Sequence, residues 1–411
     1  MRVSTRPSSA SKTALIIGAG LGGLTTALAL QRDGWCVRVC EQAHALGDVG
    51  AGITLSPGAA RALSWLGVGR ELLAASLPVP DIAFVHYRTG ELLAGTVASG
   101  APADRGFETP RHIHRADLHS ILLAAVRSLD AAAVITGQRL VAVEQGDSGV
   151  AARFAGIGAG AGAGAGGDNV ATTRKAQLLI GADGVRSAVR AALFDDSPPQ
   201  FAGQIAFRCL IPTGQAAPFM HGVSAAVSIG DARIFNRYLI RHGTLVNVIG
   251  IARSERWQQE GWHTPATVTE FLEEFAGFHP DILGLIRCAP PHSLIKWGLF
   301  VRPPLRWWSV ERVVLVGDAA HPILPFLGLG AALAIEDAVV LSRAMAQMPD
   351  LHGAFEAFQR ARMQRVEAVR LGSIRQGEII QAGDPRSSDL RKSPSQDSAI
   401  FDYDPYAVPV Q

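Results

Sequence analysis

The stretch TALIIGAGLGGLTTALALQRDGWCVRVCE, residues 13–41, constrains the fold more than any other part of the chain. Its first apolar run, residues 14–17, is uninterrupted, as is typical of a strand buried on both faces. A glycine-rich turn follows, then a helical pattern of leucines and alanines that Gly34 ends, and then a second apolar run, CVRVC. This order predicts a strand, a turn, a helix and a second strand at the start of an α/β domain.

The glycines of this turn have the spacing of a dinucleotide site. Gly18, Gly20 and Gly23 form G-x-G-x-x-G, and Glu41 closes the second strand 18 residues after Gly23. Glycines let the backbone approach a pyrophosphate, the start of the helix carries partial positive charge, and an acid accepts a hydrogen bond from a ribose hydroxyl. The pattern therefore predicts a Rossmann-like domain that binds an unphosphorylated adenosine ribose, which FAD and NAD both contain.

The same glycine spacing recurs at Gly162, Gly164 and Gly167, inside AGIGAGAGAGAGGDN. This second copy has no strand leading into it and no apolar helix leaving it. Its low complexity instead predicts a flexible loop between two strands. The comparison shows that the glycine spacing is informative only in its strand–helix context.

Two further strands are predicted to end in an aspartate. Asp183 follows the apolar run 178–180, with a helix expected to begin near Ser187, and Asp318 follows the apolar run 313–316. An acid just past a buried strand is costly unless something pairs with it. Arg115 adds a cation at the start of an amphipathic helix. Motifs spread over so much of the chain favour a long, extended cofactor over a simple nicotinamide dehydrogenase.

In this order, the G-x-G-x-x-G turn, HRADL, GADGVRSAVR and GDAAHPILPF resemble the motifs of the group A flavin-dependent aromatic hydroxylases, which have the p-hydroxybenzoate hydroxylase fold. The chain is most similar to their salicylate-hydroxylase-like members, over residues 13–380 and again at FDYDPY near the C-terminus. The resemblance implies FAD as cofactor and NADH or NADPH as reductant. It assigns the ADP part of FAD to Gly18, Gly20, Gly23 and Glu41, the flavin or pyrophosphate to Arg115, FAD and NAD(P)H binding to Asp183 and Gly184, and the ribityl chain to Asp318.

The flavin ring itself is expected between two small-residue segments. The loop 47–59, which contains Gly52, would lie against the isoalloxazine, and Pro325, Gly330 and Ala331 would approach it from the start of a helix over 328–341. Free N–H groups at that helix start can face the pyrimidine carbonyls. The family usually carries Gln at Leu329 and Asn at Gly58, so this chain departs from the pattern at both positions.

The middle of the chain is rich in β-branched residues and predicts the strands of a substrate domain. A helix is expected over TPATVTEFLEEFAGF, with Thr264 as N-cap and Pro265 at its first position. Arg208 is the main candidate for anchoring an anionic substrate, with a structural salt bridge as the alternative. His221 and His321 are the other catalytic candidates, and for His321 a structural bond to its loop is the alternative. No metal site is predicted.

These features give a domain organisation. We expect a flexible tail over 1–12, and an α/β, Rossmann-like FAD-binding domain with an inserted β-sheet substrate domain and a C-terminal helical extension. The expected limits are 13–76, 106–196 and 300–350 for the FAD domain, 77–105 and 197–299 for the substrate domain, and 351–411 for the extension. The final segment of the extension is expected to fold back onto the body. Its helix carries five arginines, which are interpreted as a solvated or dimer-contacting face: Arg360, Arg362, Arg365, Arg370 and Arg375.

The resemblance implies hydroxylation of a small phenolic or hydroxy-heteroaromatic substrate that bears a carboxylate, by NAD(P)H, O2 and a flavin C4a-hydroperoxide. The alternatives are a reductase or oxidase of the same fold and a non-catalytic dinucleotide-binding protein. The net charge of +2 favours no nucleic-acid partner, and no run of 18 apolar residues predicts a membrane span. Four cysteines without a C-x-x-C pair are interpreted as reduced thiols of a cytoplasmic protein, a monomer or homodimer.

Overall fold

The computed structural model describes residues 12–47, 50–79, 82–95, 104–156, 172–221, 223–255, 264–381, 383–386, 390 and 398–411. At its centre is a six-stranded sheet in which every neighbouring pair is parallel except β19 with β20. Its strands, in spatial order, are β19 (Ser309–Val310), β20 (Val313–Leu315), β12 (Leu178–Gly181), β1 (Thr13–Ile17), β2 (Cys36–Cys40) and β8 (Val134–Ile135). The predicted Rossmann-like α/β fold is confirmed.

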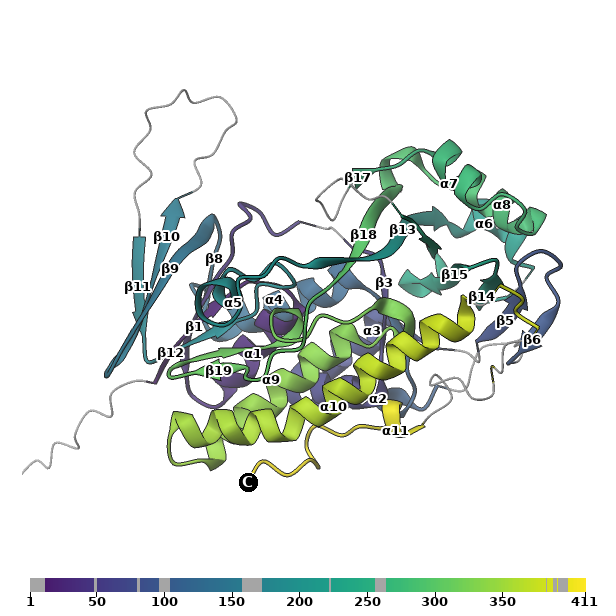
Figure 1. Ribbon diagram of the computed structural model, residues 1–411. Helices are drawn as coiled ribbons and strands as arrows, with labels where there is room; N and C mark the ends of the chain where they lie inside the picture. Colours follow the sequence, from purple (N-terminus) through teal and green to yellow (C-terminus); the bar gives the residue numbers. More distant parts are fainter. Residues whose placement is uncertain are drawn as a thin grey trace, which may run out of the picture.

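Helices pack against one another around this sheet. Helix α1 (Leu21–Arg32) packs against both α4 (Arg115–Leu129) and α9 (Gly330–Gln347), and their apolar side chains form the largest core cluster. The long helix α10 (Leu351–Ile380) lies alongside α9 (Figure 1). Two shorter helices, α2 (Pro57–Leu63) and α3 (Gly69–Ala75), pack against α9 and α4, respectively, and α5 (Ala188–Leu193) packs against β9 (Gln138–Gly146).

A second, eight-stranded sheet carries helices on its outer face (Figure 1). Its strands are β17 (Thr264–Pro265), β18 (Ile295–Val301), β13 (Gln200–Pro212), β16 (Leu245–Arg253), β15 (Arg233–Ile240), β14 (Ala225–Gly230), β5 (Ala83–His86) and β6 (Leu92–Ala94). The helices are α6 (Thr213–Met220), α7 (Val268–Glu274) and α8 (Pro280–Arg287). Phe207, Phe235, Phe271 and Phe275 pack their rings between the sheet and these helices. The opposite face of the sheet lies toward the nucleotide domain.

Two three-stranded sheets join this framework. One consists of β3 (Gly52–Leu55), β7 (Arg111–His114) and β4 (Ser76–Pro78), and the other of β11 (Thr172–Ala176), β10 (Gly149–Gly156) and β9 (Gln138–Gly146). The second sheet projects from the body at the left of Figure 1. The glycine-rich loop predicted between two of its strands lies outside the described residues.

Removing Ala159–Gly166 from that loop should leave folding and FAD content nearly unchanged. The flanking strands β10 and β11 already pair from Val150–Ala176 to Phe154–Thr172, and shortening a loop changes mainly its closure entropy, by about 0.6 kcal/mol per twofold change in length. Thermal unfolding and flavin absorbance of the purified variant measure both quantities. Loss of soluble yellow protein would show that the segment is structural.

The helix predicted from Thr264 begins later. Thr264 and Pro265 form β17 and pair with Lys296 and Ile295 of β18, so the prediction of Thr264 as N-cap is wrong. Thr267 is the N-cap, because its hydroxyl accepts from the backbone of Glu270 and the Glu270 carboxylate accepts from the backbone of Thr267. Similarly, α9 begins at Gly330, because Gly328 has a φ of +68°, outside the helical region.

The arginines of α10 are only partly solvated. Arg362 is fully buried and Arg365 is nearly so, which contradicts the prediction that all five lie on an exposed face. The C-terminal segment folds back onto the body, as predicted. Its Tyr403 ring lies over both guanidinium groups, at 4.9 Å from Arg362 and 4.8 Å from Arg365, and Arg343 donates to the carbonyl of Pro405.

Candidate functional site

The glycine turn after β1 has the geometry of a pyrophosphate site. Gly18 has a φ of +100°, and a Cβ there would lie 2.6 Å from the Ala182 carbonyl oxygen. A Cβ at Gly23 would lie 2.0 Å from the Gly18 oxygen, whereas one at Gly20 would meet nothing within 4 Å. Gly18 and Gly23 are therefore needed for the turn and its packing, and Gly20 leaves open space where α1 begins.

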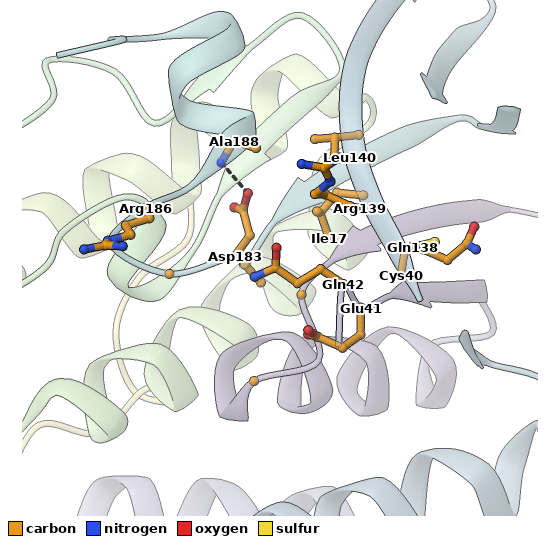
Figure 2. A pocket seen from close by; sticks show the side chains of 14 residues that line it. Ile17, Cys40, Glu41, Gln42, Gln138, Arg139, Leu140, Asp183, Arg186 and Ala188 are labelled. Atoms are coloured by element: carbon orange, nitrogen blue, oxygen red, sulfur yellow. Dashed lines mark hydrogen bonds between the residues drawn. The ribbon is translucent and has the colours of Figure 1, made fainter. Parts of the chain in front are cut away.

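Glu41 extends this site at the end of β2. Its Oε2 accepts from the backbone N–H of Ala19 at 2.8 Å, while His119 Nε2 lies 2.8 Å from the Ala19 oxygen. Glu41 lines a pocket together with the glycine turn, the start of β9 and the segment after β12 (Figure 2). Each carboxylate oxygen has a second lone pair, so Glu41 can hold the turn and still accept from a ribose hydroxyl.

Asp183 lies in the wall of the same pocket and is already bonded by its own chain. Its carboxylate accepts from Ser187 Oγ at 2.5 Å and from the backbone N–H of Ala188 at 2.7 Å, the second contact drawn in Figure 2. Desolvation raises the pKa of this carboxyl, and these hydrogen bonds oppose the rise. Asp183 therefore accepts from the backbone of the first turn of α5, and the adjoining Gly184, at a φ of +77°, faces the pocket.

A second pocket begins where the first ends, because both are lined by Gly20, Ala182 and Gly184. Asp318 opens into it. Among the described residues, no group donates a hydrogen bond to the Asp318 carboxylate, although desolvation by the surrounding protein raises its pKa and His321 and Arg115 oppose that rise. Arg115 also lines this pocket, and desolvation lowers the pKa of its guanidinium. Asp318 is thus an acceptor without a donor in the part of the chain that the structure describes.

The far end of the second pocket is built from the segments expected to face a flavin ring. Pro325, Gly330 and Ala331 line it, so the N-terminus of the 18-residue helix α9 lies at its wall. Gly52 lies nearby in β3, beside the pocket-lining Ile53; its N–H donates to Asn247 Oδ1 at 2.8 Å, and a Cβ there would lie 2.5 Å from the Tyr238 ring. Glycine at position 52 lets the nucleotide domain touch the substrate sheet.

Arg208 projects from β13 of that sheet. Its guanidinium lies 5.4 Å from the ring centroid of Trp297, which lines the second pocket. Desolvation and, to a smaller extent, the charge of Arg115 lower the pKa of Arg208 to about 10, so the group stays cationic at neutral pH. Within the described chain, no carboxylate forms an ion pair with Arg208. A half-buried, partly desolvated cation without an acidic partner in this part of the chain favours binding of an anion.

The two candidate histidines lie apart from Arg208. His221 is 65% exposed at the end of α6 and pairs with Asp281 at 2.9 Å, on the helix-bearing side of the substrate sheet. His321 is buried, and its Nε2 lies 2.6 Å from Asp337 Oδ2. Neither side chain lines the two pockets described above, so the structure does not bring them together with Arg208.

Two groups of buried polar residues were not predicted from the sequence. Glu336 and Asp337 are fully buried in α9, and the signal was present: two adjacent acids interrupt an otherwise apolar helix. His112 and Tyr238 stack at 4.0 Å between the two domains, and burial lowers the pKa of His112 to about 3. This contact joins β7 to β15 through two residues that are 126 positions apart in the sequence, and no local pattern predicts it.

The paired pockets fit FAD. They form one path from the carboxyl ends of β1 and β2, along the start of α1, to the start of α9, and they supply a ribose acceptor at Glu41 and an unpaired acceptor at Asp318. Ligands of open α/β sheets bind at this edge. Over the described ranges, no group of three or more metal-binding side chains is placed to hold an ion. Within the same ranges, no helix has both the length and the apolar character to cross a bilayer.

Comparisons with known proteins agree with this geometry. A family described as FAD binding domain matches residues 11–207 and 297–369. A 3-hydroxybenzoate 6-hydroxylase of Polaromonas naphthalenivorans is 31% identical, over 86% of this chain and 84% of that protein. A 6-hydroxynicotinate 3-monooxygenase of Bordetella bronchiseptica is 32% identical, over 86% and 88%.

Solved structures have the same fold. A salicylate hydroxylase in complex with its substrate superposes with a TM-score of 0.78 at 24% identity and covers 97% of both chains. The family match spans more than half of the chain, and the two hydroxylases exceed 30% identity over most of it. This chain therefore belongs to the group A flavin-dependent aromatic monooxygenases, a family that carries the FAD binding domain.

Proposed function

We propose that the enzyme hydroxylates a small aromatic anion, a phenol or hydroxy-heteroaromatic ring that bears a carboxylate. The observation that carries this proposal is Arg208, a half-buried guanidinium without an acidic partner among the described residues, beside the pocket wall at Trp297. Arg binds a carboxylate through two parallel N–H donors, which would neutralise the charge and orient the ring.

The names of two relatives support the substrate class. One relative acts on 3-hydroxybenzoate and another on 6-hydroxynicotinate, and each compound combines a ring hydroxyl with a carboxylate. A third, from Streptomyces platensis, is a 3-amino-4-hydroxybenzoate 2-monooxygenase, 33% identical over 86% of this chain. The shared chemistry is an electron-donating substituent on a ring with an anionic group, and this is the chemistry that we propose for the substrate here.

The residues of the chain divide the work. When bound, FAD would supply the redox chemistry that couples oxidation of NADH or NADPH to the transfer of one oxygen atom from O2, the proposed co-substrate, to the ring. Glu41 and Asp318 hold the ribose and ribityl hydroxyls, and the positive N-terminal end of α9 faces negative charge on the flavin. Arg208 holds the substrate anion. Trp297, Leu299 and Phe300 line the pocket with apolar surface that excludes water from the reacting atoms.

The function is tested with the purified protein and matched substrate pairs. We expect yellow protein with FAD bound and NADH or NADPH oxidation stimulated by hydroxybenzoates or hydroxypyridine carboxylates. The corresponding neutral carboxamides should be at least about 30-fold poorer in kcat/KM, because an unpaired buried charge costs about 2 kcal/mol or more. Chromatography and mass spectrometry identify a product that has gained one oxygen atom.

Other outcomes would assign the remaining functions. A bound flavin that NAD(P)H reduces, without any hydroxylated product from either series, would indicate a reductase or oxidase of the same fold. A protein without flavin would be a dinucleotide-binding protein. Equal activity on carboxylates and carboxamides would remove the anion from the proposal. Gel filtration decides between the monomer and the homodimer, and fractionation of cells tests the proposed cytoplasmic location.

A further inference from the structure

A network of buried charges lies behind the turn that carries Asp318. Arg362 of α10 pairs with both acids of α9: its Nη1 lies 2.8 Å from Glu336 Oε2, and its Nε donates to Asp337 Oδ1 at 2.8 Å. Arg365 adds a second contact to Glu336 at 3.3 Å. Although desolvation opposes it, the charges of His321 and Arg362 lower the pKa of Asp337 to about 2. Asp337 is therefore ionised at neutral pH and can only accept hydrogen bonds.

Of the two acids, only Asp337 reaches the turn. Its Oδ2 accepts from the backbone N–H of Gly317 at 2.8 Å and lies 2.6 Å from Nε2 of His321. Because an ionised carboxylate has no hydrogen to donate, Nε2 of His321 must carry one. Gly317 and His321 stand on either side of Asp318, so a single carboxylate oxygen holds both ends of the turn.

Other contacts hold the turn as well: the backbone N–H groups of Ala320 and His321 donate to the Gly317 carbonyl oxygen at 2.9 Å, and the His321 ring lies 4.8 Å from the Trp308 ring. Arg190 donates to the Ala320 carbonyl at 3.3 Å, and Gly317, with a φ of +59°, packs against Ala334 of α9. The Asp318 side chain itself has no hydrogen-bond donor within the described residues and opens into the pocket. Its direction is therefore determined by the backbone on either side of it.

We propose that Asp337 is a positioning residue for the cofactor: by holding Gly317 and His321, it directs the Asp318 carboxylate to the ribityl chain of FAD. Glu336 has only a structural role, although it is equally buried and pairs with the same arginine. His321 is then a positioning residue that acts through Asp337, not a proton-transfer group. This inference rests on FAD binding alone and is independent of the aromatic substrate.

The adjacent acids supply a matched pair of variants. D337N and E336Q each remove one buried negative charge from the pair with Arg362, and both should lower Tm. Only D337N should weaken FAD, by roughly tenfold or more beyond any change in E336Q, because asparagine has one acceptor oxygen where the carboxylate has two and cannot accept from both Arg362 and the donors of the turn. Titration of the apoprotein with FAD, followed by flavin fluorescence, measures Kd without any substrate. An equal rise in Kd for both variants would overturn the proposal.

A second variant decides the question if D337N does not fold. H321N removes the ring nitrogen that meets Asp337 while leaving both arginine pairs in place. We expect H321N to raise the FAD Kd with a smaller loss of Tm than E336Q shows, and to alter the visible absorbance of the bound flavin. A wild-type Kd and spectrum in folded H321N would contradict the role of Asp337 in the turn.

Discussion

Arg208→Ala should retain FAD and its fold but lose most substrate-stimulated NAD(P)H oxidation. Removing one partner of a buried charge pair costs about 2–5 kcal/mol, so kcat/KM for the preferred aromatic carboxylate should fall by roughly 30- to several-thousand-fold. The structure gives the reason, since Arg208 lies beside Trp297 with only the cation of Arg115 and no acid near it in the described residues. Steady-state kinetics and thermal unfolding on the same preparation measure the two effects separately.

Arg237 offers a matched control for this experiment. It lies on β15 of the same sheet, is 8% exposed, and donates to Ser228 Oγ at 3.1 Å. Its neighbours Phe235 and Leu239 pack with the helices of the outer face, which places Arg237 on the side away from the nucleotide domain. R237A should therefore lose stability without a comparable loss of kcat/KM. A normal kcat/KM in R208A would remove Arg208 from the active site.

Asp318→Ala should lose FAD. A hydrogen bond to a charged group contributes about 1.5–3 kcal/mol, so the Kd for FAD should rise about tenfold or more. The carboxylate has no donor from the described protein and is desolvated, so cofactor hydroxyls are its proposed partners. Undiminished FAD content with a normal Kd would contradict the assignment.

The pH dependence of FAD binding provides a second test of whether the Asp318 carboxylate binds the cofactor. Desolvation raises the pKa of this carboxyl above 3.8 in the protein without cofactor. If the ionised form accepts from FAD, binding releases the proton, and affinity must fall as the pH drops through that raised pKa. D318N keeps an acceptor oxygen but does not titrate. Its FAD Kd should therefore lack this acid dependence, which titrations at several pH values will detect.

Much of the nucleotide site could be predicted because its signals are local. The strand, the glycine turn and the helix over residues 13–32 follow from apolar periodicity and from glycine chemistry, and each lies where it was expected. Helix α5 likewise begins next to Ser187, as predicted, and Ser187 is its N-cap. Asp318 could be predicted because an acid at the end of a buried strand is energetically unfavourable unless a partner binds it.

The predictions that were wrong concern residues whose positions are determined by contacts between distant segments. Thr264 and Thr267 both resemble N-caps, and only the pairing of Thr264 with Lys296 of β18 excludes the first. Arg362 looked solvated because arginines occur all around its helix. Its burial results from the packing of α10 on α9, which brings it to acids 25 and 26 residues earlier in the chain. Side-chain pairing across helices is not encoded in the periodicity of either one.

Gly58 and the C-terminal segment have a consequence for exchanging parts between relatives. A Cβ at position 58 would lie 1.9 Å from the backbone oxygen of Tyr403, so nothing larger than glycine fits at the start of α2 while that segment is in place. The usual asparagine of the family is therefore incompatible here for a steric reason, independent of flavin chemistry. The residue at position 58 and the path of the chain at Tyr403 must therefore be exchanged together. A chimaera that takes a larger residue at position 58 from a relative, but keeps this C-terminal segment, must displace the segment.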